Sequence, residues 1–250
     1  MNLVIAAATN MEQKDLRIFL QSAKRHLRNV DLFLLVLEEQ AWMRESEGLH
    51  WAIIEPKFHI SMERNFAALE LLNTYDGHYD KVLLSDSRDV LFQSNPFDHI
   101  SDDIITGLEE SNIGNSKANF KWISDIYGGK TALQLASFQI ACSGIVLGPV
   151  SLVREYLKLM CDEIEGCGDY MRHGPNLDQA MHNYLMYNGP LLITGTQNRE
   201  GLVATIALEQ EENIALNRNQ VYVQGKVPPI IHQYDRWPRL KTQIENMYPN

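Results

Sequence analysis

A short apolar segment followed at once by two carboxylates is the part of this chain whose residue types most directly indicate chemistry. Residues 82–84 are Val-Leu-Leu, and Asp86 and Asp89 follow closely. Short apolar runs of this kind are typical of buried strands in a parallel sheet, and ligands bind where such strands end. Two aspartates in a partly dry crevice raise each other's pKa unless a cation compensates. The motif therefore predicts a hard divalent metal ion with oxygen ligands.

The spacing of the two aspartates leaves two interpretations open. Side chains alternate along a strand, so Asp86 and Asp89 would point to opposite faces if the chain stayed extended. A turn directly after Asp86 would bring both carboxylates to one side. The structural alternative is that Asp86 caps the turn while Asp89 pairs with Arg88 or faces solvent, since aspartate is common in turns and caps.

The elements before this motif alternate between strand and helix. Residues 3–8 and 31–37 are predicted strands, and residues 13–27 between them have apolar side chains at helical spacing. A second helix is predicted over residues 64–72, with Ser61 as its cap. This βαβ order predicts the α/β class, with a mixed, mostly parallel central sheet flanked by helices.

The elements after the motif continue this pattern with one interruption. Residues 102–108 and 139–147 are predicted strands, and residues 151–165 and 177–187 are predicted amphipathic helices. The stretch 109–136 between the two strands has several glycines and no clear period. Long irregular segments in compact domains are often functional loops, so a binding loop is predicted there.

Length and composition limit the class of protein. The 250 residues suffice for one large domain, and 45% of them are hydrophobic, as in globular proteins. A formal charge of −10 argues against a nucleic-acid partner, because such binding requires neutralising phosphates with Lys and Arg. No apolar run reaches the roughly 18 residues of a membrane span, although a peripheral contact through a local basic patch stays open.

The remaining features predict a reducing compartment. The N-terminus lacks a basic leader and is interpreted as a first strand, not as a signal peptide. The three cysteines, Cys142, Cys161 and Cys167, are odd in number and lack zinc-ribbon spacing. Reduced, structural thiols and a cytoplasmic location are therefore expected.

Five landmarks occur in an order that resembles a known family, the GT-A fold nucleotide-diphospho-sugar glycosyltransferases. Their order is closest to the family 8 group of glycogenin-like and lipopolysaccharide galactosyl- and glucosyltransferases. The landmarks lie in residues 3 to 238, nearly the whole chain. They are the end of the first strand (Ala8-Thr9-Asn10), the acidic motif (Asp86 to Asp89), Cys142 to Leu147, Leu177 to Ala180, and Ile230 to Pro238.

The resemblance implies a single GT-A domain over residues 1–250. Residues 1–100 would form its nucleotide-binding half. Residues 101–250 would form an acceptor-side half, in which 109–136 is the acceptor-side loop, and a C-terminal closing segment. The activity implied is transfer of a sugar from a UDP-sugar to a glycan or other hydroxyl acceptor, with retention of anomeric configuration. The sequence itself does not fix retention, and an inverting enzyme would need a carboxylate base, for which Asp125 or Asp178 would serve.

The resemblance also implies a metal site. Asp86, Asp89 and His232 match the positions that bind Mn²⁺ or Mg²⁺ together with the donor diphosphate. Oxygen ligands suit either ion, and the imidazole favours manganese. The structural alternative for His232 is an ordinary core or loop histidine.

Two residues at the start of a predicted helix match the family's catalytic positions. Gln179 would lie beside the anomeric carbon, and Asp178 would bind donor or acceptor hydroxyls. The alternative is that Asp178 only complements the helix dipole.

Five further residues match donor-binding positions. Ala7 and Thr9 would form the base pocket, where small side chains let a uracil ring approach the backbone. Ser143 and Gly144 lie where the family carries an Asn/Ser-Gly turn. Arg64 would contact the nucleotide, with a solvated arginine at the start of a helix as the alternative.

One departure from the family concerns metal dependence. The commonest family motif is Asp-x-Asp, but here Arg88 occupies the third position and the second acid comes one residue later. If no turn follows Asp86, the guanidinium of Arg88 is the alternative partner for the diphosphate, through its forked donors.

Other classes remain as alternatives. A catalytically degenerate GT-A protein would bind a nucleotide without turnover, and the Arg88 substitution favours it. A sugar nucleotidyltransferase would carry a Gly-rich, basic loop after the first strand, where residues 6–10 are Ala-Ala-Ala-Thr-Asn. A haloacid-dehalogenase-type phosphatase would need Asp-x-Asp at an early strand end.

Overall fold

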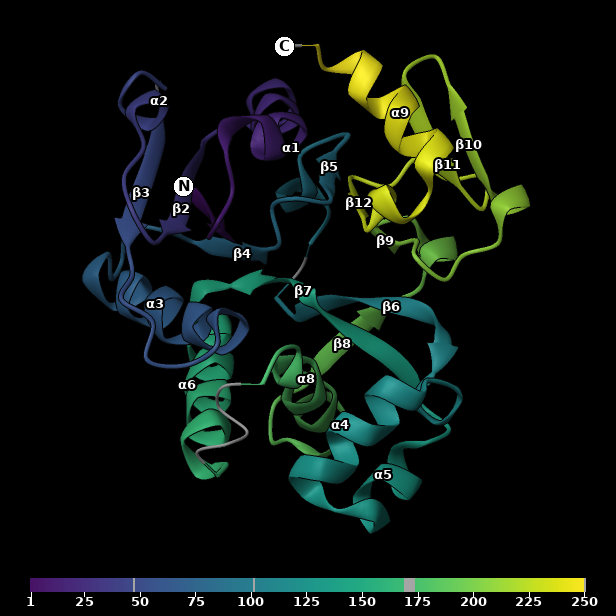
Figure 1. The fold of residues 1–250 in the computed structure, drawn as a ribbon. Helices are drawn as coiled ribbons and strands as arrows, with labels where there is room; N and C mark the ends of the chain where they lie inside the picture. The colour runs from purple at the N-terminus through teal and green to yellow at the C-terminus, as the bar shows by residue number, and fades with distance from the viewer. Residues whose placement is uncertain (47, 101, 169–173, 250) are drawn as a thin grey trace.

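The computed structural model describes residues 1–46, 48–100, 102–168 and 174–249. A seven-stranded sheet forms the centre, in the order β3-β2-β1-β4-β7-β6-β8 (Figure 1). Its strands are β1 (Asn2–Ala7), β2 (Val30–Val36), β3 (Leu49–Ile53), β4 (Lys81–Ser85), β6 (Ile104–Asn112), β7 (Gln139–Pro149) and β8 (Ile193–Thr196). Only β7 runs against its neighbours β4 and β6, and every other pair is parallel. The predicted α/β class with a mostly parallel, mixed sheet is confirmed.

Helices cover the sheet on both faces (Figure 1). The α-helices are α1 (Gln13–His26), α2 (Ala41–Arg44), α3 (Ile60–Thr74), α4 (Lys117–Tyr127), α5 (Gly129–Leu135), α6 (Val150–Gly166), α8 (Leu177–Asn188) and α9 (Pro238–Met247). Short 3-10 turns occupy Pro96–His99, Ile113–Asn115, Asn198–Glu200, Glu211–Asn213 and Tyr234–Arg236. In the described residues, no helix is long and apolar enough to cross a membrane.

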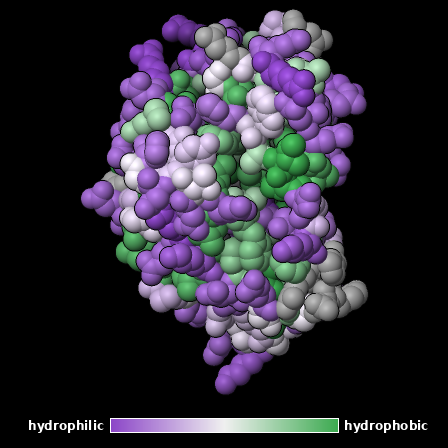
Figure 2. All heavy atoms as spheres, turned by 90° about the vertical axis from the view of Figure 1, so that its left-hand side faces the viewer, coloured by the Kyte–Doolittle hydropathy of each residue, from purple (hydrophilic) through white to green (hydrophobic). Residues whose placement is uncertain are grey.

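The two faces of the sheet build two separate cores because side chains alternate along each strand. On β1, Leu3 and Ile5 belong to the core that packs under α3, α6 and α8. Val4 and Ala6 belong to the core on the opposite face, which includes residues of α1. Figure 2 turns the side with α2, β3 and α3 toward the viewer, where hydrophilic residues cover most of the surface and hydrophobic ones gather in a few patches.

A second, small sheet lies on the α1 side of the central one (Figure 1). It has the order β5-β12-β9, with β5 (Val90–Phe92), β12 (Ile230–His232) and β9 (Val203–Thr205). The β12 strand is antiparallel to β5 and parallel to β9. A hairpin of β10 (Ile214–Asn217) and β11 (Gln220–Val223) adjoins it and shares a core with α9. This sheet brings the C-terminal region beside the acidic motif, which directly precedes β5.

Two local predictions are wrong. The stretch 109–136 is no irregular loop, because β6 continues to Asn112 and α4 and α5 follow. The two helices are short and separated only by Gly128, whose φ of +85° suits glycine, so no helical period extends far enough to be noticed. Ser61 is not the cap of α3, since the helix begins earlier and His59 Nδ1 accepts from the Ser61 backbone N–H.

The central core supplies a stability test. Leu83 in β4 is fully buried, whereas Leu133 on α5 is 69% exposed. We expect Leu83→Ala to lower the free energy of unfolding by about 2–5 kcal/mol, because it leaves a cavity in a packed core. Leu133→Ala should change it by less than about 0.5 kcal/mol. Urea unfolding of both variants measures the difference, and equal effects would contradict the assigned burial of β4.

Candidate functional site

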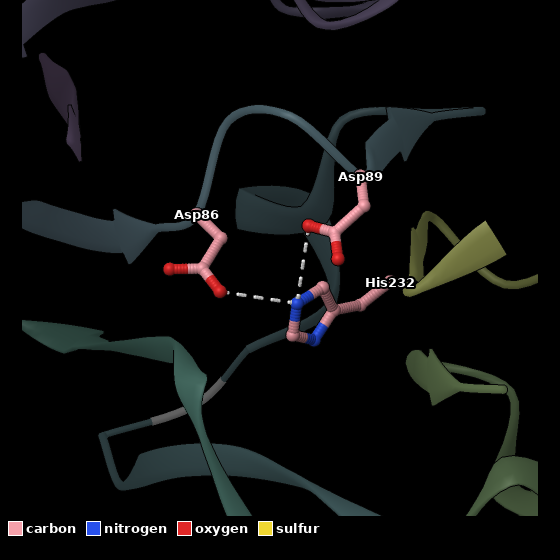
Figure 3. A group of neighbouring side chains, drawn as sticks. All are labelled: Asp86, Asp89 and His232. Atoms are coloured by element: carbon pink, nitrogen blue, oxygen red, sulfur yellow. Dashed lines mark ion pairs between the residues drawn. The ribbon is translucent and has the colours of Figure 1, made fainter. Parts of the chain in front are cut away.

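The acidic motif forms a bend between β4 and β5. The backbone N–H of Asp86 donates to the carbonyl of Gly144 on β7 at 2.8 Å, and the Ser87 hydroxyl donates to the carbonyl of Ala7 at the end of β1. These bonds hold the bend against the end of β1 and the middle of β7. The bend brings the carboxylates of Asp86 and Asp89 toward the same imidazole (Figure 3). Of the two predicted geometries, the turn is the one that occurs.

His232 completes the cluster from the far end of the chain. It is the last residue of β12, where it pairs with Val90, and its side chain is 1% exposed. Its Nε2 lies 3.4 Å from Asp86 Oδ2 and 3.6 Å from Asp89 Oδ1 (Figure 3). One ligand atom from each of the three residues lies within 4.8 Å of the others. His232 is therefore part of the site and not an ordinary core histidine.

The electrostatics of this cluster favour a cation. Nε2 of His232 is buried and makes no hydrogen bond among the described residues. Burial lowers the pKa of His232, but Cys142, Asp89 and Asp86 outweigh this and raise it well above the usual value. A field that attracts a proton so strongly also attracts a metal ion. Two carboxylates and one imidazole form a donor set that suits Mn²⁺.

Gly144 has no side chain and so leaves the space in front of the cluster open. A Cβ added there would lie 2.6 Å from Asp86 Oδ2 and 2.8 Å from His232 Nε2, and would also overlap the imidazole carbon Cε1. Any side chain at this position would therefore displace the ligand atoms. The backbone conformation of Gly144 is not left-handed, so conformation does not require a glycine there. The glycine is needed because Asp86 and His232 approach its Cα too closely for a Cβ to fit.

Arg64 on α3 connects the cluster to a second set of residues. Its guanidinium donates to Asp86 Oδ1, to Asp178 Oδ2 at 2.8 Å and to the Ser143 carbonyl at 3.2 Å. Burial lowers the pKa of Arg64, but the carboxylates of Asp86 and Asp178 outweigh it and raise the pKa above its ordinary value. For Asp86, burial raises the pKa, yet Arg64 and His232 hold it well below its usual range. Arg64 is thus a charged and mostly buried member of the site, 18% exposed at its side chain, and the alternative of a solvated arginine is wrong.

The first turn of α8 presents Asp178 and Gln179 to the same region. Asp178 is 3% exposed and accepts from Arg64 and, at 3.1 Å, from the Ser143 hydroxyl. Gln179 Nε2 donates to Asn119 Oδ1 at 3.1 Å and to Glu109 Oε1 at 3.3 Å. Its Oε1 accepts from the Ser143 backbone N–H at 3.4 Å. The Gln179 amide is therefore fixed in orientation by its neighbours.

Most of these residues line one cavity of about 330 Å³, whereas His232, Glu109 and Asn119 do not line it. Asp86, Asp89, Asp178, Arg64 and Arg236 supply its ionised groups, so carboxylates outnumber guanidinium groups along the wall. Its lining consists of Ser61, Arg64, Asp86, Asp89, Trp122, Cys142, Ser143, Gly144, Asn176, Asp178, Gln179, Gln233 and Arg236.

Several predicted residues lie outside this cavity. Arg88 is exposed and does not line it, because the bend directs its side chain away from the ligand cluster. Ala7 lines a small neighbouring cavity together with Arg64 and Ser143, and Thr9 follows the end of β1 without lining either. Asp125 lies on α4 and pairs with Lys121. Neither Arg88 nor Asp125 is therefore part of the wall of this cavity.

Four residues that shape the site had no role predicted from the sequence. Arg236 Nη2 lies 3.6 Å from Asp89 Oδ2, and Gln233 also lines the cavity. Both follow His232 closely, so their position in the terminal landmark was the available clue. Glu109 and Asn119, which hold Gln179, lie in the stretch interpreted as a loop. Without the helix α4, nothing in the sequence placed Asn119 beside α8.

No protein-family model matches the chain, and no curated protein sequence matches it. The interpretation of the site therefore depends on its geometry and chemistry.

The close approach at Gly144 gives a test of the cluster. We expect Gly144→Ala to weaken Mn²⁺ binding at least about tenfold, because the added methyl displaces Asp86 and His232 from a common ligand position. Gly129→Ala is the matched control, since the Cβ there meets nothing closer than 3.8 Å. Electron paramagnetic resonance of Mn²⁺ titrated into each variant measures the affinity, and equal affinity in both variants would contradict the assignment.

Proposed function

We propose that this protein is a metal-dependent glycosyltransferase that transfers a sugar from a UDP-sugar to a hydroxyl acceptor, such as a glycan. The observation that carries the proposal is the convergence of Asp86, Asp89 and Nε2 of His232 beside a polar cavity at the carboxyl end of β4. Nε2 is buried and makes no hydrogen bond among the described residues. In α/β sheets this is the edge where nucleotides bind. The order of motifs along the sequence, which resembles the family 8 glycosyltransferases, supports the same conclusion.

The charge of the cavity supports a metal-bound diphosphate. Three carboxylates and two guanidinium groups line it, and Arg64 is already paired with two of the carboxylates. A diphosphate alone would be repelled from such a wall. Asp86, Asp89 and His232 would hold the divalent cation, which when bound neutralises the departing diphosphate. Arg236, 52% exposed at its side chain, would add a second positive charge from the cavity wall.

Residues of α8 would position the sugar. Asp178 offers a carboxylate held by Arg64 and Ser143, suited to accept hydrogen bonds from sugar hydroxyls. Gln179 is fixed by four hydrogen bonds to three residues and would lie beside the anomeric carbon. A retaining reaction would let the leaving phosphate oxygen take the acceptor proton. Trp122 from α4 and the segment after His232 border the cavity and would limit entry of water, which otherwise hydrolyses the donor.

Ligand-dependent melting tests the donor and the metal together. A ligand that binds only the native state raises the melting temperature, by roughly 5–10 °C for a chain of this size at about 100 times its Kd. We expect such a shift with UDP and Mn²⁺ together, and a much smaller one with UDP alone. A shift with UDP that needs no metal would contradict metal dependence. No shift with any nucleotide would contradict the proposed donor.

Donor hydrolysis tests the ligand role of Asp86 without knowledge of the acceptor. We expect Asp86→Asn to reduce Mn²⁺-stimulated hydrolysis of UDP-sugars by about 100-fold or more, because several kcal/mol of charge stabilisation is lost. Asp125→Asn is the control, since Asp125 lies outside the cavity. A thermal melt confirms that both variants fold. Unchanged hydrolysis in folded Asp86→Asn would refute the assignment.

A further inference from the structure

Cys142 lies directly behind the imidazole of His232. Its side chain is 2% exposed, and Sγ is 3.6 Å from Nδ1 of His232. The opposite ring nitrogen, Nε2, faces Asp86 and Asp89. The sulfur therefore contacts the side of the ring that points away from the proposed cation.

The direction of the Cys142–His232 contact follows from the role of the opposite ring nitrogen. A neutral imidazole carries one proton, and a cation at Nε2 would need the lone pair of that nitrogen, so the proton would then lie on Nδ1. The sulfur of Cys142 is in contact with Nδ1. Gln233 Nε2 also donates to this sulfur, at 3.8 Å. The lone pairs of the sulfur are therefore what Cys142 would offer to the Nδ1–H of His232.

We infer that Cys142 is a positioning residue for the metal site. Its sulfur accepts the Nδ1–H of His232 and so keeps the Nε2 lone pair directed between Asp86 and Asp89. Metal-binding histidines generally donate their second ring N–H to an acceptor that fixes tautomer and ring orientation. A cysteine sulfur fills that place here. The inference rests on the proposed function, because it presumes the cation at this cluster.

The strand that carries Cys142 also contacts α8. Ser143, the next residue of β7, donates its backbone N–H to Gln179 Oε1 at 3.4 Å. Neighbouring residues of one strand therefore contact both His232 and the amide proposed to lie beside the anomeric carbon.

Substitutions that separate hydrogen bonding from packing test the role of Cys142. Serine keeps an acceptor, whereas valine keeps the apolar bulk without one. We expect Cys142→Val and Cys142→Ala to weaken Mn²⁺ binding about 10-fold to 100-fold, and Cys142→Ser to stay close to the wild type. Cys161→Ser is the matched control, because Cys161 is also buried but lies on α6. Paramagnetic resonance of Mn²⁺ measures affinity, and thermal melting checks the fold.

The outcomes distinguish a hydrogen-bonding role of Cys142 from a packing role. Tight Mn²⁺ binding by Cys142→Val with weak binding by Cys142→Ser shows that the residue acts through packing, and overturns the inference. Tight binding by Cys142→Ala overturns it too, and this variant serves if the valine variant does not fold. If the wild type binds no Mn²⁺, the proposed metal dependence fails together with the inference. If the wild type and all Cys142 variants bind equally, only the inference fails.

Discussion

The buried guanidinium of Arg64 is the interaction on which the rest of the site depends. It leaves α3, reaches Asp86 after β4, and contacts the Ser143 carbonyl on β7 and Asp178 on α8. Four elements that are distant in sequence are therefore held by one side chain. Removing one partner from a buried ion pair is strongly destabilising, by about 3–5 kcal/mol, because it leaves an uncompensated charge. The carboxylates at this edge of the sheet are tolerated because Arg64 is among them.

The reversed direction of β7 explains how one strand contributes so much to the cavity. Its residues 145–149 pair with β4, which ends at Ser85. The preceding part of β7 therefore extends past the end of β4, beside the bend that carries Asp86. Cys142, Ser143 and Gly144 lie in this extension and line the cavity. A parallel strand ending level with β4 would have left that region to loops, which position side chains less rigidly.

The sequence predicted the fold class and the core of the site because local chemistry determined both. Alternating strands and helices were visible as periodic apolar residues, and Asp86 and Asp89 stood at a strand end. The turn between them was left open, because it depends on hydrogen bonds to Gly144 and Ala7, which are distant in sequence. The helices α4 and α5 were missed because both are short.

Residues that act through long-range contacts were the hardest to predict. The sequence gives no reason to place Glu109 beside Gln179, or the sulfur of Cys142 beside the imidazole of His232. Such contacts depend on how the sheet and α8 pack, and no local pattern encodes them. The candidate ligands were found through the resemblance to a family. The residues that hold those ligands in place depend on packing.

The position of His232 in the chain determines when the site can exist. Asp86 and Asp89 belong to the first half of the sequence, but the imidazole of His232 belongs to β12. This strand pairs with β5 and β9. Domains fold as units during synthesis from the N-terminus, and contacts between distant residues form late. A growing chain that already holds both carboxylates therefore has no complete cluster until its last strand is added. A chain cut before this strand would still contain the strands of the central sheet but not the imidazole that completes the cluster.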